Sequence, residues 1–369
     1  MEQVTCIVLG GGFAGIHAMK AIHQAFHEQK DRMELNLILM DKLEAHVRKV
    51  LLFQPAASGE PITVPWKQLL PEGVRFVQGA ATHIDHERKQ LHYQDQNGNE
   101  KKLPFDKLVV AVGSMAEKHA SDQGGFSLID TDSARDIRIK WMANLEQAAK
   151  TSNSLEKRRL MCAAVAGAGI TGVETAAELA HAMKAESLRI GLDPHDVQVH
   201  LFNAKARLFQ EGPVKVSHKI ERTLAACGVT VHHQCKALYE KDGLLNVSSR
   251  KSLPVGLTIW TLGLKPNPIL LQLSLPLTKD EQVKVDASYR VNGRPNIYSI
   301  GDCAHIVDPI TGIADGMTCK EAIPQAQRLG SVLYADMTGG TAPQHKNVIT
   351  SFTIGLGPDR GNVDTQMGA

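Results

Sequence analysis

Residues 5–15 read T-C-I-V-L-G-G-G-F-A-G, an apolar run that passes directly into a cluster of glycines. The run from Thr5 to Leu9 suits a strand that is buried on both faces. Apolar residues then recur at helical spacing, at Ile16, Met19, Ile22 and Phe26. The stretch therefore predicts a strand, a tight turn and a helix in immediate succession.

The glycines of this turn have the spacing of a dinucleotide-binding loop, G-x-G-x-x-G. Gly10 lets the chain turn out of the strand, Gly12 leaves its backbone open to a pyrophosphate, and Gly15 lets the helix pack closely. The first helical residues present free N–H groups and a partial positive charge to the phosphates. We therefore predict contacts to a dinucleotide from Gly10, Gly12, Phe13, Ala14 and Gly15.

A carboxylate follows the next predicted strand. The apolar run from Leu35 to Met40 ends at Asp41, 26 residues after Gly15. At the end of that strand a carboxylate can accept hydrogen bonds from both ribose hydroxyls of an adenosine. Asp41 and the adjacent Lys42 therefore complete the first predicted nucleotide site.

The same pattern recurs later in the chain. The apolar run from Met161 to Ala166 leads into V-A-G-A-G-I-T-G-V-E at residues 165–174, and a further strand is predicted at residues 197–201. Two copies in one chain predict two nucleotides side by side and electron transfer between them. The predicted contacts of the second copy are Gly167, Gly169, Ile170, Thr171, Gly172 and Glu174.

The second copy lacks the terminal acid of the first. Its strand reads V-H-L-F-N, so Asn203 stands at the carboxylate position, and Lys205 and Arg207 follow. A carboxylate would repel a ribose 2′-phosphate, whereas an uncharged amide beside cations tolerates one. The sequence therefore leaves both NADH and NADPH open as the second nucleotide. Alternatively, Lys205 and Arg207 are solvated surface charges.

The composition limits the class of protein. The 369 residues suffice for two domains, 43% of them are hydrophobic, and the net charge of +2 argues against a dedicated nucleic-acid binder. No window approaches ~18 consecutive apolar residues, and we expect no cleavable leader. The six cysteines form no C-x-x-C pair, which predicts free thiols in a reducing cytoplasm. The histidines show no H-E-x-x-H spacing, so no metal is predicted.

The region between the two copies predicts small β elements. Val74 to Val77 and Leu91 to Tyr93 alternate like strands of an antiparallel sheet, with N-G-N at residues 97–99 as the expected turn between them. Residues 115–159 are polar and partly helical, as expected of a connection into the second nucleotide domain.

Two further apolar runs each reach a glycine. Residues 108–114 read L-V-V-A-V-G-S, and residues 259–265, I-W-T-L-G-L-K, repeat that shape. Each run predicts a buried strand whose end opens toward a nucleotide. We therefore expect Gly113 to contact the first nucleotide and Gly263 the second.

A third motif, N-I-Y-S-I-G-D-C-A at residues 296–304, completes a resemblance. The chain resembles the pyridine nucleotide-disulfide oxidoreductase superfamily of flavoproteins without its redox cysteine pair, and within it type II NADH dehydrogenases and apoptosis-inducing-factor-like enzymes. The resemblance implies an α/β fold of two Rossmann-like dinucleotide-binding domains, the second inserted into the first, with small antiparallel β elements. The implied bounds are 1–120 and 253–330 for the FAD-binding domain, 121–252 for the NAD(P)H-binding domain, and 331–369 for a short C-terminal segment.

The resemblance also assigns roles to single residues. Asp302 would hold the ribityl chain of FAD, Gly301 would let the pyrophosphate approach, and Glu174 would orient the cofactor near the nicotinamide. Residues 316–330 resemble the helix that faces the flavin, with an amphipathic core helix as the alternative. Because proline fits the first turn of a helix best, Pro324 predicts a later start of that helix.

Three other residues near these motifs are expected to have structural rather than catalytic roles. Cys303 and Cys319 fall near the implied flavin, but with no partner cysteine in register we expect them to pack rather than react. His46 lies just beyond Asp41, within possible reach of FAD, and we expect a surface position for it.

Two features depart from type II NADH dehydrogenases. Those enzymes carry A-Q-x-x-x-Q on the helix near the quinone, whereas Gln325 and Gln327 here have a different spacing. Those enzymes also end in amphipathic helices that lie on the membrane, whereas residues 353–369 here are glycine-rich and polar.

The resemblance implies an FAD-dependent NAD(P)H oxidoreductase with ping-pong hydride transfer, from NAD(P)H to FAD and then to an acceptor, with a quinone as the expected acceptor. Two alternatives stay open, a ferredoxin or rubredoxin reductase and a slow redox-sensing protein like apoptosis-inducing factor. We expect a small-molecule acceptor, no nucleic-acid partner and no transmembrane segment. The expected location is the cytoplasm, with peripheral contact to the inner face of the membrane as an option.

Overall fold

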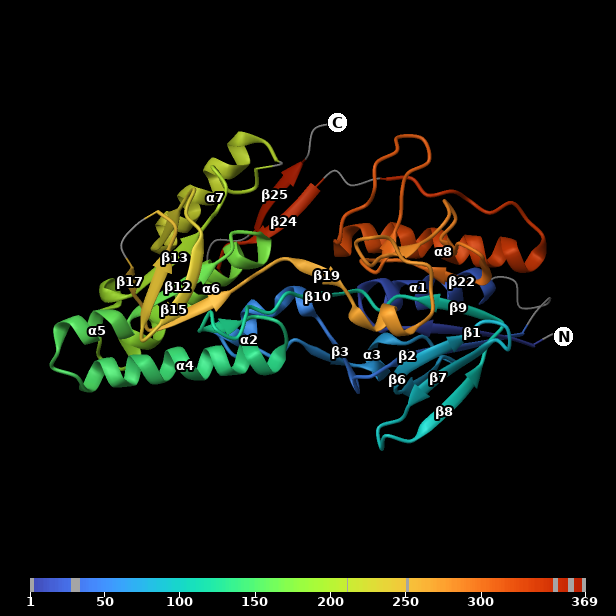
Figure 1. Cartoon of the computed structure of the whole chain (residues 1–369), viewed down its shortest axis with the longest axis horizontal. Helices are drawn as coiled ribbons and strands as arrows, with labels where there is room; N and C mark the ends of the chain where they lie inside the picture. Colours follow the sequence, from blue (N-terminus) through green and yellow to red (C-terminus); the bar gives the residue numbers. More distant parts are fainter. Residues whose placement is uncertain are drawn as a thin grey trace. The chain divides into compact units, whose positions relative to one another are not determined.

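The computed structural model describes residues 3–27, 34–210, 212–249, 252–347, 351–357 and 362–366. The chain divides into two compact units, whose elements are labelled in Figure 1. The first unit comprises Met1–Arg48, Thr63–Met115 and Leu264–Ile349, and the second comprises Lys49–Ile62, Ala116–Gly263 and Thr350–Ala369. Each unit is built around its own sheet of largely or wholly parallel strands.

The first unit is organised by a six-stranded sheet in the order β21-β22-β9-β1-β2-β5. All neighbouring strands pair in parallel except β21, which closes one edge antiparallel to β22. The carboxyl ends of parallel strands meet at one edge of a sheet, where ligands of this architecture bind. The strands are β1 (Gln3–Leu9), β2 (Glu34–Asp41), β5 (Arg75–Gln78), β9 (Lys107–Val110), β21 (Arg290–Val291) and β22 (Arg294–Ser299).

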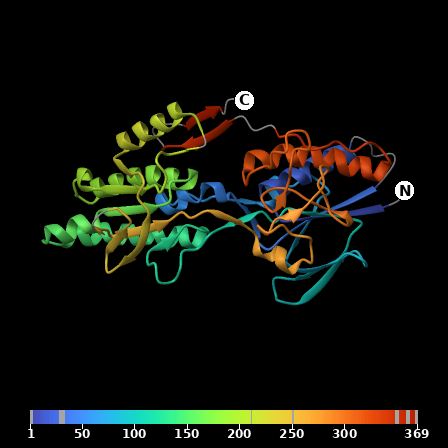
Figure 2. The same cartoon turned by 45° about the horizontal axis from the view of Figure 1, so that its top comes forward.

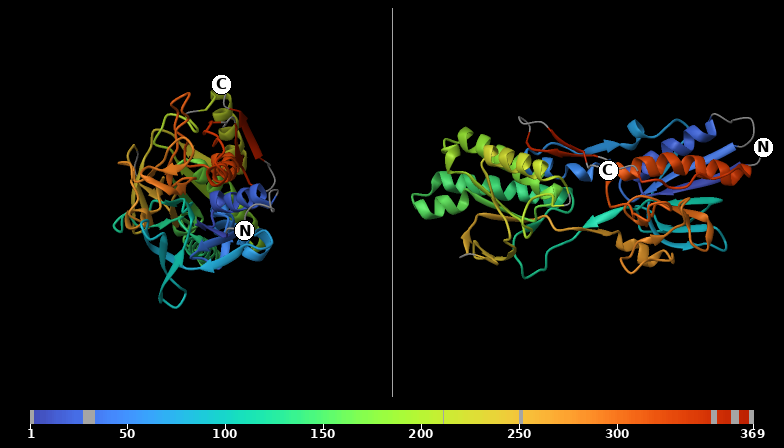
Figure 3. Two further views of the ribbon diagram at one scale, coloured as in Figure 1. Left: turned by 90° about the vertical axis from the view of Figure 1, so that its right-hand side faces the viewer. Right: turned by 90° about the horizontal axis from the view of Figure 1, so that it is seen from above.

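Two helices cover one face of this sheet, and a small antiparallel sheet covers the other. α1 (Phe13–His27) and α8 (Cys319–Thr338) lie side by side (Figures 1 and 2), and Met19 and Leu329 pack with Val8 of β1. Leu9 belongs to the opposite cluster, where it packs with Leu91 of the small sheet. Figure 3 shows the strands of that small sheet in teal. That sheet consists of β6 (Ala80–Asp85), β7 (Gln90–Gln94) and β8 (Glu100–Pro104).

The small sheet corrects one prediction. Residues 74–77 were expected in it, but β5 extends the parallel sheet beside β2 instead. The partner of Leu91 is Ile84 on β6, and the turn at residues 97–99 joins β7 to β8. The alternation of a short strand does not reveal its partner, because parallel and antiparallel edges accept the same apolar pattern.

Short elements complete the first unit. β3 pairs with β4, β10 with β19, and β20 with β23. These elements are β3 (Ala45–Val47), β4 (Thr63–Pro65), α3 (Trp66–Leu69), β10 (Ser114–Ala116, ending at the boundary), β19 (Leu264–Pro266), η3 (Pro268–Gln272), β20 (Val283–Lys284) and β23 (Ala304–His305).

The second unit has a five-stranded, wholly parallel sheet in the order β11-β18-β12-β13-β14. One of its faces packs against a three-stranded antiparallel sheet, where Leu245 meets Cys162 and Ala164 of β12. The parallel strands are β11 (Phe126–Ser127), β12 (Cys162–Ala166), β13 (Gln198–Phe202), β14 (Val229–His232) and β18 (Leu257–Trp260). The antiparallel strands are β15 (Ala237–Lys241), β16 (Leu244–Val247) and β17 (Leu253–Pro254).

The helices of the second unit come from two parts of the chain, and a third part supplies a hairpin. α2 packs on α4 and α6, and the C-terminal hairpin β24–β25 contacts α6 and α7 (Figure 2). The helices are η1 (Lys49–Leu51), α2 (Phe53–Ala57), α4 (Thr131–Lys150), α5 (Ser154–Leu160), α6 (Ile170–Arg189), η2 (Pro194–Asp196) and α7 (Val214–Cys227). The hairpin is formed by β24 (Ser351–Gly355) and β25 (Asn362–Gln366).

The compact units differ in their bounds from the expected domains. The return to the first unit lies at Leu264, not at residue 253, because β18 pairs with β11 and β12 of the second sheet. Residues 49–62 join the second unit through buried apolar residues of α2, and the Trp141 indole donates a hydrogen bond to the Ala56 carbonyl at 3.0 Å. Which nucleotide each unit binds stays a prediction.

Candidate active site

The glycine loop of the first unit has a closed side and an open side. A Cβ added to Gly10, where φ is +103°, would lie 2.5 Å from the Ala111 carbonyl oxygen. A Cβ on Gly15 would lie 1.8 Å from the Gly10 carbonyl oxygen, so the helix approaches the loop as closely as the spacing predicts. A Cβ on Gly12 would meet nothing within 4 Å. The middle glycine therefore borders open space at the start of α1, where a pyrophosphate can approach.

Asp41 fastens the end of β2 to this loop. Its Oδ2 accepts a hydrogen bond from the Gly11 backbone N–H at 2.6 Å, and its Oδ1 accepts one from Leu43 N–H at 2.8 Å. The carboxylate thus lies at the carboxyl edge of the sheet, beside the loop. This is where a ribose-binding acid is needed.

His46 is buried, which corrects the expected surface position. Its side chain is 6% exposed, and its Nδ1 lies 2.9 Å from the Gly11 carbonyl oxygen. Because a carbonyl oxygen only accepts, Nδ1 carries a proton. Burial lowers the pKa of His46. The pairing of β3 with β4 places the ring near Trp66, with ring centroids 6.1 Å apart, and no sequence pattern predicted that pairing.

Asp302 and Gly113 come together at the same edge of the first sheet. The Ser114 hydroxyl donates a hydrogen bond to Asp302 Oδ2 at 2.5 Å, across 188 residues of sequence. A Cβ on Gly113 would meet nothing within 4 Å, so the strand end after β9 is also open. Sequence analysis found Gly113 and Asp302 but missed Ser114, because no motif spacing connects two separate strand ends.

A buried polar network supports Gly301 from α8. The Gln325 side chain is 1% exposed, and its Oε1 accepts a hydrogen bond from Gly301 N–H at 2.8 Å. Its Nε2 donates to Asp315 Oδ2 at 2.7 Å, and Asp315 Oδ1 lies 3.1 Å from His345 Nε2. The Tyr289 hydroxyl lies 3.0 Å from His345 Nδ1. These residues fix the turn before Asp302, and their scattered positions left no sequence signal.

The helix α8 begins earlier than expected. Its first residue is Cys319, because the Thr318 hydroxyl accepts the Glu321 N–H and forms the cap. Pro324 therefore lies inside the helix, where its missing N–H removes one backbone hydrogen bond. Glu321 is buried and accepts hydrogen bonds from Gly316 N–H at 2.7 Å and the Thr318 hydroxyl at 2.9 Å, and burial raises its pKa.

The glycine loop of the second unit repeats the geometry of the first. A Cβ on Gly167, where φ is +116°, would lie 2.3 Å from the Thr261 carbonyl oxygen, and a Cβ on Gly172 would lie 1.8 Å from the Gly167 carbonyl oxygen. A Cβ on Gly169 would again meet nothing within 4 Å. Thr261 also donates a hydroxyl hydrogen bond to the Gly167 carbonyl at 2.9 Å. The second loop therefore also opens at its middle glycine.

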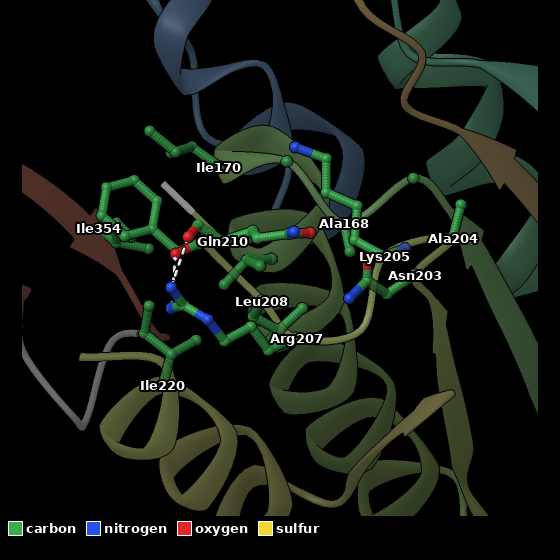
Figure 4. A pocket seen from close by; sticks show the side chains of 14 residues that line it. Ala168, Ile170, Asn203, Ala204, Lys205, Arg207, Leu208, Gln210, Ile220 and Ile354 are labelled. Atoms are coloured by element: carbon green, nitrogen blue, oxygen red, sulfur yellow. Dashed lines mark hydrogen bonds between the residues drawn. The ribbon is translucent and has the colours of Figure 1, made fainter. Parts of the chain in front are cut away.

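A cavity of about 400 Å³ adjoins this loop (Figure 4). It combines the loop and the start of α6 with the segment after β13, the helix α7 and the C-terminal hairpin. Predicted contacts Gly167, Gly169, Ile170 and Asn203 line it. The other lining residues are Ala168, Val173, Ala204, Lys205, Arg207, Leu208, Phe209, Gln210, Ile220 and Ile354.

Arg207 braces the wall of the cavity. Its guanidinium donates hydrogen bonds to the Phe209 carbonyl at 3.1 Å and to the Gln210 carbonyl (Figure 4). It also donates to the Ser217 hydroxyl at 2.8 Å. The Arg207 guanidinium is therefore hydrogen-bonded to the protein and is not a purely solvated surface charge. Lys205 lines the cavity with it.

Glu174 meets the C-terminal hairpin. Its Oε1 accepts a hydrogen bond from Gly355 N–H at 3.0 Å, and burial raises the pKa of Glu174 to about 7, an effect that this hydrogen bond partly offsets. Ile354 and Leu356 beside Gly355 are 1% and 0% exposed. From its sequence this segment is glycine-rich and polar, and no pattern in it indicates that its apolar residues cover α6.

Gly263 follows β18, as Gly113 follows β9. Its carbonyl accepts a hydrogen bond from Glu117 N–H at 2.9 Å, and a Cβ on it would come no closer than 3.9 Å to Glu117 Oε2. This strand end is therefore open, like its counterpart in the first unit.

The sequence matches the pyridine nucleotide-disulphide oxidoreductase family over residues 4–328. The chain belongs to this family. The expected α/β fold and the stated resemblance are therefore confirmed.

Relatives and solved structures agree with this placement. The chain is 26% identical to the demethylphylloquinone reductase NdbB of Synechocystis sp. over 344 residues, which is 90% of this chain and 79% of the relative. It is 24% identical to the type II NADH:quinone oxidoreductase Ndh of Mycobacterium tuberculosis over 367 residues, 92% of this chain and 74% of the relative. The structure of NDH2 from Plasmodium falciparum in complex with NADH matches with a TM-score of 0.81 and 19% identity, over 98% of this chain and 90% of that one. This structural similarity concerns the fold.

The family takes its name from disulphide chemistry, but none of the six cysteines of this member, all of which the structure describes, forms a disulphide. Cys303 is 0% exposed, its thiol approaches the Ile300 carbonyl at 3.3 Å, and burial raises its pKa. A buried thiol with a raised pKa is a poor nucleophile, which supports packing as its role.

The described residues contain neither a metal-binding group nor a membrane-spanning helix. In that part of the chain no three His, Cys, Asp or Glu side chains are grouped as a metal would need. None of the helices described here combines the length and apolar character that crossing a bilayer requires.

Proposed function

We propose that this protein is an FAD-dependent NAD(P)H:quinone oxidoreductase. The observation that carries the proposal is the repeated glycine loop, closed at its first and third glycines and open at its second in both units. One chain with two such loops is built to hold two dinucleotides, and the family to which it belongs transfers electrons between them.

The first unit fits FAD. The open backbone at Gly12 and the start of α1 would receive the pyrophosphate, and Asp41 would accept hydrogen bonds from the adenosine ribose. Asp302, held by Ser114, would accept hydrogen bonds from the polyol chain. When bound, FAD would supply the two-electron redox chemistry that no side chain of the protein provides.

The second unit fits the nicotinamide nucleotide. Gly169 and the start of α6 would receive its pyrophosphate, and Asn203 lies where the adenosine ribose is expected. Glu174, whose pKa of about 7 leaves it close to half protonated at neutral pH, would orient the nicotinamide through hydrogen bonds. The chain's task is to hold donor and acceptor in contact, since hydride transfer needs little acid–base chemistry.

A quinone is the proposed acceptor because the two relatives described above are named for quinone reduction. The balanced reaction consumes NAD(P)H, one proton and a quinone and yields NAD(P)⁺ and a quinol. Long-chain quinones reside in membranes, so we place the protein at the inner face of the cytoplasmic membrane, in peripheral contact. Reduction of ferredoxin or rubredoxin, or slow redox sensing, remains the alternative prediction.

Anaerobic mixing of the purified protein with NADH and with NADPH tests the proposal. Loss of the flavin's visible absorbance is expected with at least one donor, followed by recovery when a quinone is added. Gly169→Val is expected to retain FAD and lose this bleaching, because its new side chain would occupy the pyrophosphate position. Flavin that stays oxidised with both donors would refute the proposal.

Turnover with a panel of acceptors then separates the alternatives. Quinones should support turnover at least about tenfold faster than ferredoxin, ferricyanide serving as a positive control for electron transfer. Faster turnover with ferredoxin, or slow turnover with every acceptor, would favour the reductase or the redox sensor instead.

A further inference from the structure

Three polar side chains form a hydrogen-bonded triad that ends in the cavity of the second unit. Asn203 follows β13, and its Nδ2 lies 3.0 Å from Nδ1 of His233, which follows β14. His233 Nε2 lies 3.2 Å from Oε1 of Glu221 on α7. β13 and β14 are adjacent parallel strands, so their ends lie at one edge of the sheet and bring Asn203 and His233 together.

The chemistry of the three side chains in this triad fixes the direction of each hydrogen bond. An ionised carboxylate only accepts, so His233 Nε2 donates to Glu221. In the neutral ring Nδ1 then accepts, and it accepts from Asn203 Nδ2. Asn203 Oδ1 in turn accepts the Lys205 backbone N–H at 3.1 Å. With this tautomer both ends of the amide are oriented, Oδ1 by the Lys205 N–H and Nδ2 by His233 Nδ1.

This orientation decides what the cavity offers to a ligand. The Asn203 side chain is 5% exposed and lines the cavity, and its amide retains one N–H beyond the bond to His233. A carboxylate at this place would offer acceptors only and would repel a phosphate. The backbone of Asn203 is also fixed, because its N–H donates to the His232 carbonyl at 2.9 Å.

We propose that His233 and Glu221 are positioning residues that hold the Asn203 amide as a donor, so that the site admits an adenosine 2′-phosphate and hence NADPH as well as NADH. The inference rests on the proposed function, which assigns the nicotinamide nucleotide to this cavity. Lys205 adds a positive charge to the same wall. Neither His233 nor Glu221 lines the cavity itself, so their effect on the ligand passes through Asn203.

Calorimetric titration of the purified holoprotein tests this with two probes, 5′-AMP and 2′,5′-ADP, which differ only in the 2′-phosphate. Glu221→Gln replaces the acceptor-only carboxylate with an amide that can either accept or donate, so the histidine tautomer is no longer fixed, and His233→Ala removes the acceptor for Asn203. Each variant should weaken 2′,5′-ADP binding about fivefold to twentyfold and change 5′-AMP binding less than about twofold. Asp136→Asn, an exposed carboxylate of α4 in the same unit, is the charge-matched control and should leave both affinities unchanged.

The ratio of the two affinities separates positioning from general damage. Equally weakened binding of both probes would mean that the variants merely loosen the unit. Unchanged affinities would mean that Asn203 is held in place without His233 and Glu221. Either result overturns the inference and leaves the proposed function intact. A wild-type protein that binds neither probe would overturn both. Glu221 is about 30% exposed, so Glu221→Gln decides the matter if His233→Ala does not fold.

Discussion

The Glu174 carboxylate accepts a hydrogen bond from the Gly355 backbone N–H at 3.0 Å, across 181 residues of sequence. Through this contact the strand β24 lies on α6, and Ile354 beside it lines the cavity next to the second glycine loop. The C-terminal hairpin is therefore part of the second unit's site. Four predictions follow from this contact and from the loops.

Replacing Glu174 by glutamine should make stability less dependent on pH. Burial raises the pKa of Glu174 to about 7 from 4.5, so the folded state binds the proton more tightly than the unfolded state. The resulting stabilisation is complete below about pH 4.5 and is lost as the pH rises through about 7, by at most about 3 kcal/mol. Thermal unfolding of both proteins should show the variant gaining on the wild type between about pH 5 and about pH 8. A difference in Tm that does not change with pH would contradict the buried carboxylate.

Leu356→Ala should destabilise the second unit. The side chain is 0% exposed, and its removal leaves a void that costs about 2–4 kcal/mol. Leu188→Ala on α6 is the matched control, because Leu188 is 69% exposed and should cost less than about 0.5 kcal/mol. Urea unfolding followed by circular dichroism measures both. Equal effects would show that the hairpin does not stay docked in solution.

Gly12→Val and Gly10→Val should fail in different ways. A Cβ on Gly12 meets no protein atom within 4 Å, so the variant should fold but lose FAD. A side chain on Gly10 would collide with the Ala111 carbonyl, so that variant should lose the fold itself. Circular dichroism and the ratio of flavin to protein absorbance separate the outcomes. Full FAD content in folded Gly12→Val would exclude this loop as the pyrophosphate site.

Gln325→Leu should weaken FAD binding more than Gln327→Leu. The first substitution leaves the buried Gly301 N–H without its acceptor, which costs about 1–3 kcal/mol and loosens the turn that carries Asp302. Gln327 is exposed on the same helix, so its replacement serves as the control. Fluorescence titration of the apoprotein with FAD measures both affinities, and we expect about a tenfold loss for Gln325→Leu. Identical affinities would remove the proposed support of Gly301.

Sequence patterns were sufficient wherever a function depends on neighbours in the chain. The three glycines of each loop act through backbone geometry within six residues, and the loops adopt the open and closed positions that the spacing predicts. Asp41 is the last residue of β2 and Asp302 lies shortly after the end of β22, so the sequence located both at strand ends. Their roles stay predictions. The helix start at Cys319 was missed, because Pro324 predicts a later start, whereas Thr318 caps the helix upstream of that proline.

The sequence by itself determined the family, the two glycine loops and the order of strand, turn and helix, because these follow from local spacing and burial. The tertiary structure alone decided which distant side chains meet: Gln325 with Gly301, Asn203 with His233, and Glu174 with Gly355. Such contacts depend on strand order and on helix docking over the whole chain. A polar residue in an isolated sequence carries no mark of the partner that will satisfy its hydrogen bonds once it is buried.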